Sequence, residues 1–220
     1  MAAHKRGPVF TDRVEAGERL GAHLRRRTWS DPVVVGLARG GVPVAAAVAT
    51  ALGAPLDVAV TRKIGAPGRP EWGVGAVAAD GSVGWDAAAL RRLGAAAAAH
   101  LAEEAARQRA EAGRQLRRYR AVAPAVPVED RDALLVDDGL ATGVTARVAL
   151  GRLRAARPGL LVLAVPVGRA ATAAALRSDE AADDVVVLVA PTVLGAVSCW
   201  YHDFGQTSEA DVLAALMRPR

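Results

Sequence analysis

The chain has 220 residues, of which 52% are apolar, so it has enough apolar side chains to bury a core and is not a disordered chain. It contains no run of about 18 uncharged apolar residues and no apolar stretch near the N-terminus, which argues against a membrane span and a secretory signal peptide. The single cysteine, Cys199, excludes an internal disulfide and suits a reducing cytoplasm. A net charge of +5 could attract nucleic acid or phosphorylated metabolites, but scattered solvated arginines are the simpler interpretation.

The first 85 residues alternate apolar runs of strand length with stretches of helical period. This alternation is typical of βαβ units with a mainly parallel sheet. The predicted elements are a helix at 12–27, a strand at 32–38, a helix at 41–53, a strand that begins at 56–65, and small and apolar residues that alternate over 71–85 around a hairpin turn at Asp80-Gly81.

Residues 87–120 are rich in alanine and in mixed charges, and predict one or two helices. Glutamates interleaved with arginines usually form a solvated helix face supported by ion pairs four residues apart. An RNA-binding helix is the alternative. The proline-containing stretch 121–132 is predicted to be a connector.

The last 90 residues continue the strand and helix alternation. The predicted elements are strands at 134–136, 159–168 and 183–191, helices at 144–154 and 169–178, an irregular segment at 192–208, and a closing helix at 209–217 that Ser208 caps.

Two adjacent carboxylates, Asp137 and Asp138, follow the buried strand at 134–136. In an open parallel sheet, ligands bind beyond the carboxyl ends of the strands. The turn at 139–145 then leads into the amino end of a helix, whose free N–H groups suit a phosphate, and Thr142 and Thr145 add hydroxyl donors. Because carboxylates accept hydrogen bonds from a vicinal diol, the stretch could hold a sugar phosphate. An acidic loop start with helix-capping character is the structural alternative.

Two nucleotide motifs fit this chain less well. A P-loop needs a lysine after its glycine-rich turn, and none follows here. The stretch "GVGAVA" at 73–78 resembles a dinucleotide fingerprint in its letters, but it neither follows a clear strand nor opens a helix. We therefore interpret it as a strand with glycines.

These residues carry a family resemblance. "LLVDDGLATGVT" resembles the ribose-phosphate motif of type I phosphoribosyltransferases, and "VVVGLARGGVPVAAAVA" looks like the pyrophosphate loop of that family. "TRKIGAPGRPEWGVGAVAADG" and "WYHDFGQTSEADV" look like a bacterial subgroup of predicted phosphoribosyltransferases of unknown acceptor. The resemblance implies an α/β, type I phosphoribosyltransferase-like fold with a mainly parallel central sheet flanked by helices. It also implies one domain over 1–220, with a helical insertion at about 86–122 and a C-terminal hood at about 191–207.

The resemblance assigns a role to each part of the ligand-binding motifs. Asp137 and Asp138 would bind the ribose hydroxyls of phosphoribosyl pyrophosphate and favour the positive carbon of an oxocarbenium-like transition state. The residues that would cradle the 5-phosphate are Ala141, Thr142, Gly143, Val144 and Thr145. Val144 departs from the small or hydroxylated residue of many members, which would remove one phosphate donor.

The pyrophosphate would bind at Arg39, Gly40 and Gly41, where the resemblance implies a cis non-proline peptide near Arg39-Gly40. Arg62 is expected to add a pyrophosphate contact and Lys63 a catalytic one, from a mobile loop after the second strand. Mg²⁺ is the expected cofactor, since it would neutralise the leaving pyrophosphate, with Asp137 and Asp138 as indirect ligands.

The acceptor pocket is the least determined part of the site. Trp200, Tyr201 and Phe204 could stack on a flat base, or they could fill the core beside the closing helix. His202, Asp203 and Gln206 could bind the edge of a base, and Trp72 and Trp85 are further candidates for stacking. No residue stands out as a general base.

The sequence thus predicts a cytoplasmic, Mg²⁺-dependent phosphoribosyltransferase that joins the pentose to a nitrogenous base or amine. Its expected partners are phosphoribosyl pyrophosphate and a small-molecule acceptor, without membrane or nucleic acid. Two alternatives stay open, a phosphoribosyl-binding regulator that binds RNA through the long basic helix, and a sugar-phosphate hydrolase. The acceptor and the oligomeric state stay open too, with a homodimer as one alternative.

Overall fold

Seven strands form one sheet in the order β4-β3-β2-β1-β5-β6-β7 in the computed structural model, which describes residues 8–217. Strands β1, β2, β5, β6 and β7 pair in parallel, and β2, β3 and β4 pair in antiparallel fashion, which confirms the mainly parallel α/β prediction. The strands are β1 (Val33–Ala38), β2 (Leu56–Ala66), β3 (Arg69–Ala78), β4 (Val83–Trp85), β5 (Asp132–Val136), β6 (Leu160–Val167) and β7 (Asp184–Val189).

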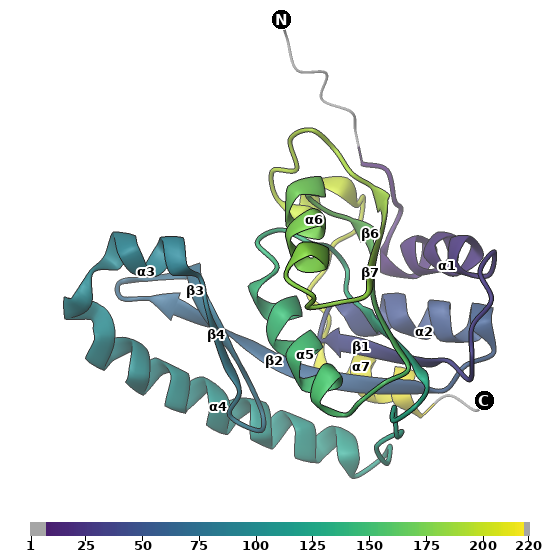
Figure 1. Ribbon diagram of the computed structural model, residues 1–220, viewed down its shortest axis with the longest axis horizontal. Coiled ribbons are helices and arrows are strands. Elements are labelled where there is room, and N and C mark those ends of the chain that lie inside the picture. The colour runs from purple at the N-terminus through teal and green to yellow at the C-terminus, as the bar shows by residue number, and fades with distance from the viewer. Residues whose placement is uncertain (1–7, 218–220) are drawn as a thin grey trace, which may run out of the picture.

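Helices cover both faces of the sheet (Figure 1). Alternate residues of the parallel strands face opposite layers, since Val34 packs with α1 and α2 whereas Val35 packs with α5 and α6. This burial on both faces explains why these strands are continuous apolar runs in the sequence. The helices are α1 (Arg13–Leu24), α2 (Gly41–Leu52), α3 (Ala87–Leu93), α4 (Ala98–Arg120), α5 (Val144–Ala155), α6 (Ala170–Ser178) and α7 (Glu209–Leu216), with 3₁₀ turns η1 (Ala95–Ala97) and η2 (Val197–Trp200).

An arm extends from the body and consists of the second half of β2 together with β3, β4, α3 and α4 (Figure 1). The prediction that Arg62 and Lys63 follow the second strand in a loop is wrong, because both lie within β2. Residues 61–66 of β2 pair with β3 after β2 has left β1, so the strand continues into a hairpin. Adjacent strand residues point to opposite faces, and Arg62 and Lys63 therefore face different sides of the arm.

Local signals confirm several predicted elements. The β3–β4 hairpin turns at Asp80-Gly81, where Gly81 has a positive φ of 96°. Ser208 forms a capping box with Asp211 at the start of α7. The stretch 87–120 contains two α-helices, since Gly94 with φ 73° ends α3 before η1 and α4 begin.

Several charged residues of α4 form ion pairs, some within the helix and some with other elements, and the pairs within the helix are three residues apart rather than the predicted four. Arg107 pairs with Glu104 and Arg114 with Glu111, each three residues apart, and Arg118 pairs with Glu209 of α7. These pairs match the interpretation of a solvated helix face.

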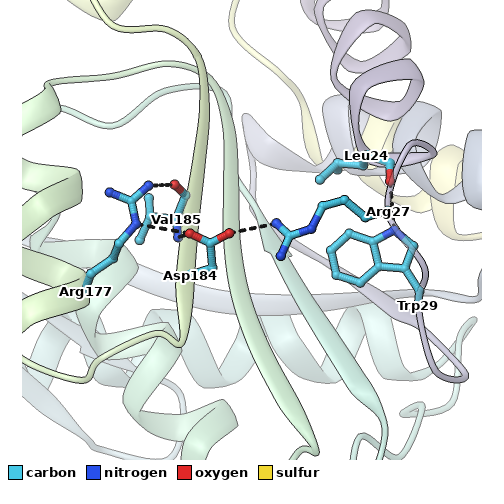
Figure 2. A network of polar contacts seen from close by, with 6 residues as sticks. All are labelled: Leu24, Arg27, Trp29, Arg177, Asp184 and Val185. Atoms are coloured by element: carbon cyan, nitrogen blue, oxygen red, sulfur yellow. Dashed lines mark hydrogen bonds and ion pairs between the residues drawn. The ribbon is translucent and has the colours of Figure 1, made fainter.

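A polar network at the amino end of β7 joins the segment after α1 to α6 (Figure 2). Asp184, the first residue of β7, pairs with Arg27 at 2.7 Å and with Arg177 at 3.1 Å. Trp29 Nε1 donates to the carbonyl of Leu24 at 2.9 Å and so fixes the chain after α1. This network lies at the end of the sheet opposite the carboxyl ends of the strands.

None of the helices in residues 8–217 has the length and apolar character needed to cross a bilayer. The sequence also predicts that the N-terminus is not a signal peptide. Residues 1–7 of that segment lie outside the described residues.

Candidate functional site

Two loops meet at the carboxyl ends of the neighbouring strands β1 and β5. β1 leads into α2 on one face of the sheet, and β5 leads into α5 on the other face. Such a reversal between adjacent parallel strands opens the crevice in which α/β proteins bind ligands. The topology thus brings the acidic pair of β5 beside the glycines that follow β1.

The glycines after β1 allow this close approach. An ideal Cβ on Gly41 would lie 2.6 Å from the carbonyl oxygen of Val136 and 2.8 Å from Cα of Asp137, and one on Gly40 would overlap Oδ2 of Asp138. The cis peptide in this loop joins Ala38 to Arg39, one bond before the predicted position. The predicted pyrophosphate loop and the predicted ribose site are therefore in direct contact.

The turn between β5 and α5 is shaped by its backbone. Gly143, with φ 78°, precedes α5, and no side chain in the described part of the chain caps that helix. The Thr172 hydroxyl donates to the carbonyl of Ala141 at 2.8 Å, and Leu140 N–H donates to the carbonyl of Val167 at 2.9 Å. The first N–H groups of α5 thus remain available to an anion.

Val144, at the start of α5, packs against the arm. Its side chain packs with Ala76 and Ala78 of β3 and with Val148. An apolar residue at this position joins the first turn of α5 to the arm.

Burial dominates the electrostatics of the acidic pair. Burial, followed by the neighbouring Asp138 carboxylate, raises the pKa of Asp137 well above its usual value, and Asp138 N–H donates to Asp137 Oδ1 at 2.9 Å. Burial also raises the pKa of Asp138, and Arg13 opposes that effect through an ion pair at 2.8 Å. A ligand that donates hydrogen bonds or develops positive charge would therefore stabilise the ionised pair.

Arg13 is a residue of this site that sequence reasoning missed. It is the first residue of α1 and lies 125 positions before Asp138, so no local pattern connects the two. Only the packing of α1 beside the sheet brings them together.

Lys63 and Thr142 line one cavity of about 500 Å³ between the arm and the turn before α5. Trp72, Asp86 and Arg92 line it as well. Arg62 lies on the other face of the arm, where its Nε donates to Gln108 of α4 at 2.5 Å. The structure therefore brings Lys63 close to the predicted phosphate turn and keeps Arg62 apart from it.

The aromatic residues of the C-terminal segment have different surroundings. Tyr201 is buried between Phe10 and Phe204, with ring centroids 5.4 and 4.9 Å away, and its hydroxyl donates to the carbonyl of Asp138 at 2.6 Å. Tyr201 therefore fills a core, but it packs with Phe10 and Val167 and not with the closing helix as the core-filling alternative has it. Trp200 and Phe204 are half-buried, and their acceptor role stays a prediction. The edge-binding candidates His202, Asp203 and Gln206 likewise stay predictions.

Comparisons with known proteins test the family resemblance of this chain. A family model described as a phosphoribosyl transferase domain matches residues 12–193. A Mycobacterium tuberculosis H37Rv protein, whose name assigns it phosphoribosyl transferase activity only provisionally, is 42% identical over 210 residues. That match covers 96% of this chain and 47% of the relative, so the chain spans about half the length of the curated relatives it matches.

A solved structure, that of TT1426 from Thermus thermophilus, is 41% identical to this chain. The match has a TM-score of 0.76 and covers 94% of this chain and 97% of that one. Together the matches confirm the resemblance inferred from the motifs.

Proposed function

We propose a reaction for this chain, which belongs to the phosphoribosyl transferase domain family. The chain transfers a phosphoribosyl group from phosphoribosyl pyrophosphate to a nitrogenous base or an amine and releases pyrophosphate. The observation that carries the proposal is the contact between the acidic pair of β5 and the glycines before α2, next to the uncapped start of α5. Acidic acceptors for a diol and backbone donors for two anions are thus grouped at one crevice.

Each part of the substrate has a matching group. The N–H groups of 141–145 hold the 5-phosphate at the positive end of the α5 dipole. Asp137 and Asp138 accept hydrogen bonds from the ribose hydroxyls, and Arg39 with Gly40 and Gly41 holds the pyrophosphate at the start of α2. The substrate would then lie across the ends of β5 and β1.

The reaction exchanges one bond at the anomeric carbon for another. The bond between that carbon and the pyrophosphate oxygen breaks, its electron pair leaves with pyrophosphate, and the acceptor nitrogen forms the new bond and then loses a proton. The carbon is most positive in the transition state, when the old bond has largely broken and the new bond has not yet formed. The carboxylates of Asp137 and Asp138, which accept hydrogen bonds from the ribose hydroxyls, stabilise that positive charge. Because pyrophosphate leaves readily, positioning supplies much of the rate.

In this scheme Mg²⁺ would bind together with the substrate. Within the described residues, no three acidic, histidine or cysteine side chains gather into a metal site. Asp137 and Asp138 are the residues that would face the ion, as indirect ligands. When bound, the ion would neutralise charge on the leaving pyrophosphate.

The partners of the proposed enzyme are phosphoribosyl pyrophosphate and a small acceptor in the cytoplasm. The single cysteine of the sequence is compatible with that reducing setting.

One titration and one activity assay test the proposed function. Isothermal titration calorimetry with phosphoribosyl pyrophosphate and Mg²⁺ is expected to show one site per chain. Release of pyrophosphate is then measured across a panel of purine and pyrimidine bases and simple amines, and at least one acceptor is expected to stimulate it. Binding without release for any acceptor would favour the regulator, release of phosphate from the sugar would favour the hydrolase, and no binding would reject all three.

Lys63→Ala is expected to lower kcat by about tenfold or more, a typical loss when one stabilising contact to the leaving group is removed, with a smaller change in KM. Arg62→Ala separates the two predicted residues of β2. Arg62 donates to Gln108 on the other face of the arm, so we expect Arg62→Ala to keep the wild-type kcat. A loss as large as that of Lys63→Ala would instead support the predicted pyrophosphate contact of Arg62. Steady-state kinetics of both variants provide the comparison. A wild-type kcat for Lys63→Ala would remove Lys63 from the site.

A further inference from the structure

One guanidinium joins three segments that are far apart in the sequence. Arg13 Nε donates to Asp138 Oδ2 at 2.8 Å, and Arg13 Nη1 donates to the carbonyl of Gly205 at 2.7 Å. Its Cζ also lies 3.7 Å from the ring centroid of Phe204. The side chains of Arg13 and Asp138 are only 12% and 17% exposed, so water screens their ion pair little. These contacts hold the guanidinium from three directions.

The same neighbourhood fixes Asp138 at two points. Arg13 engages one carboxylate oxygen, and the Tyr201 hydroxyl donates to the backbone carbonyl at 2.6 Å. Gly40 lies against the carboxylate from the side of the pyrophosphate loop. A carboxylate held through one oxygen presents the other in a defined direction, which a hydroxyl of a bound pentose requires.

We propose that Arg13 is a positioning residue that orients Asp138 toward a pentose hydroxyl and links it to the C-terminal segment, an inference that rests on the proposed phosphoribosyl transfer. An arginine suits this position because its planar fork donates in two directions while its face stacks on Phe204. A lysine can keep the charge but cannot make all three contacts. Since Gly205 and Phe204 follow Trp200, the same side chain connects the predicted acceptor segment to the ribose site.

The test compares Arg13→Gln and Arg13→Lys with a matched control, Arg19→Gln. Arg19 also lies on α1, donates to the carbonyl of Val9 at 2.9 Å and stacks on Phe10, but it does not contact the acidic pair. Calorimetric titrations use ribose 5-phosphate and, separately, inorganic phosphate. For Arg13→Gln we expect about tenfold weaker binding of ribose 5-phosphate and nearly unchanged phosphate binding, because only the diol needs Asp138. Arg13→Lys should recover part of the loss, and Arg19→Gln should match wild type.

A double-mutant cycle separates positioning from a general structural effect. If Arg13 acts through Asp138, Arg13→Gln adds little further loss in an Asp138→Asn background. The inference is overturned if Arg13→Gln binds ribose 5-phosphate like wild type, if it weakens phosphate equally, or if its effect persists in full without the Asp138 carboxylate. Failure of the wild type to bind ribose 5-phosphate would instead overturn the proposed function, and this inference with it.

Discussion

The double substitution Asp137→Asn plus Asp138→Asn is expected to abolish binding of phosphoribosyl pyrophosphate while the protein stays folded. Two hydrogen bonds from ribose hydroxyls to charged groups, each contributing about 1.5–3 kcal/mol, predict a loss of about 100-fold or more. Asparagine keeps the size of each side chain but removes the negative charge that the positive anomeric carbon requires. Calorimetry with phosphoribosyl pyrophosphate and Mg²⁺ measures the effect, and an unchanged affinity would refute the assignment of the pair.

The chain contains a matched control pair at the other end of the sheet. Asp183 and Asp184 are also adjacent aspartates beside a strand, but they pair with Arg154, Arg27 and Arg177. Ion pairs and nearby N–H groups hold the pKa values of both aspartates below normal despite partial burial. Asparagine at both positions should therefore lower the stability of the protein. The affinity for the ligand should stay at the wild-type value. Weakened binding in this control would show that the loss of affinity in the Asp137→Asn plus Asp138→Asn variant follows from a disturbed fold.

The stability of the single variant Asp137→Asn checks that the fold is intact. Burial and Asp138 raise the pKa of Asp137 in the folded state, so the folded protein retains this proton to a higher pH than the unfolded chain does. Stability contributed by that proton is lost as the pH rises from the unfolded pKa through the folded one. The Tm of Asp137→Asn minus the Tm of wild type should therefore become more positive as the pH is raised from acidic to alkaline.

Gly41→Ala is expected to lose ligand binding together with stability. The new Cβ would press on the carbonyl oxygen of Val136 and on Cα of Asp137, both of which belong to the backbone at the end of β5. Since neither backbone atom can rotate away, the loop and β5 must separate, at a cost of about 1–3 kcal/mol. Chemical unfolding and titration with ribose 5-phosphate measure the two effects.

Gly151→Ala in α5 provides the control for this substitution. An added Cβ at Gly151 would meet no atom within 4 Å, and the residue is exposed within a helix. Alanine there should stabilise the protein by about 0.5–1 kcal/mol and leave binding unchanged. Wild-type affinity in Gly41→Ala would show that the close contact between the two loops is not needed for the site.

Much of the fold could be predicted because its signals are local. The strands buried on both faces are uninterrupted apolar runs, and the acidic pair and its turn stand in one short stretch after β5. The extension of β2 could not be predicted in the same way. Arg62 and Lys63 end the apolar run, and only the pairing with β3 keeps the chain extended there.

The parts of the site that depend on distant segments were not predictable from local patterns. Arg13 is one of many arginines in the sequence, and nothing in the surrounding "DRVEAG" distinguishes it from Arg19. Its contacts with Asp138, Phe204 and Gly205 arise from the packing of α1 against the C-terminal segment. Likewise, the burial of Tyr201 follows from its contact with Phe10 at the other end of the chain.

A crystal structure of the full chain with ribose 5-phosphate tests the central claim most directly. The phosphate should accept hydrogen bonds from the N–H groups at the start of α5, and the ribose hydroxyls should donate to Asp137 and Asp138, with Arg13 still on Asp138 Oδ2. Ribose 5-phosphate bound elsewhere, or bound here with its hydroxyls turned away from both carboxylates, would contradict the account.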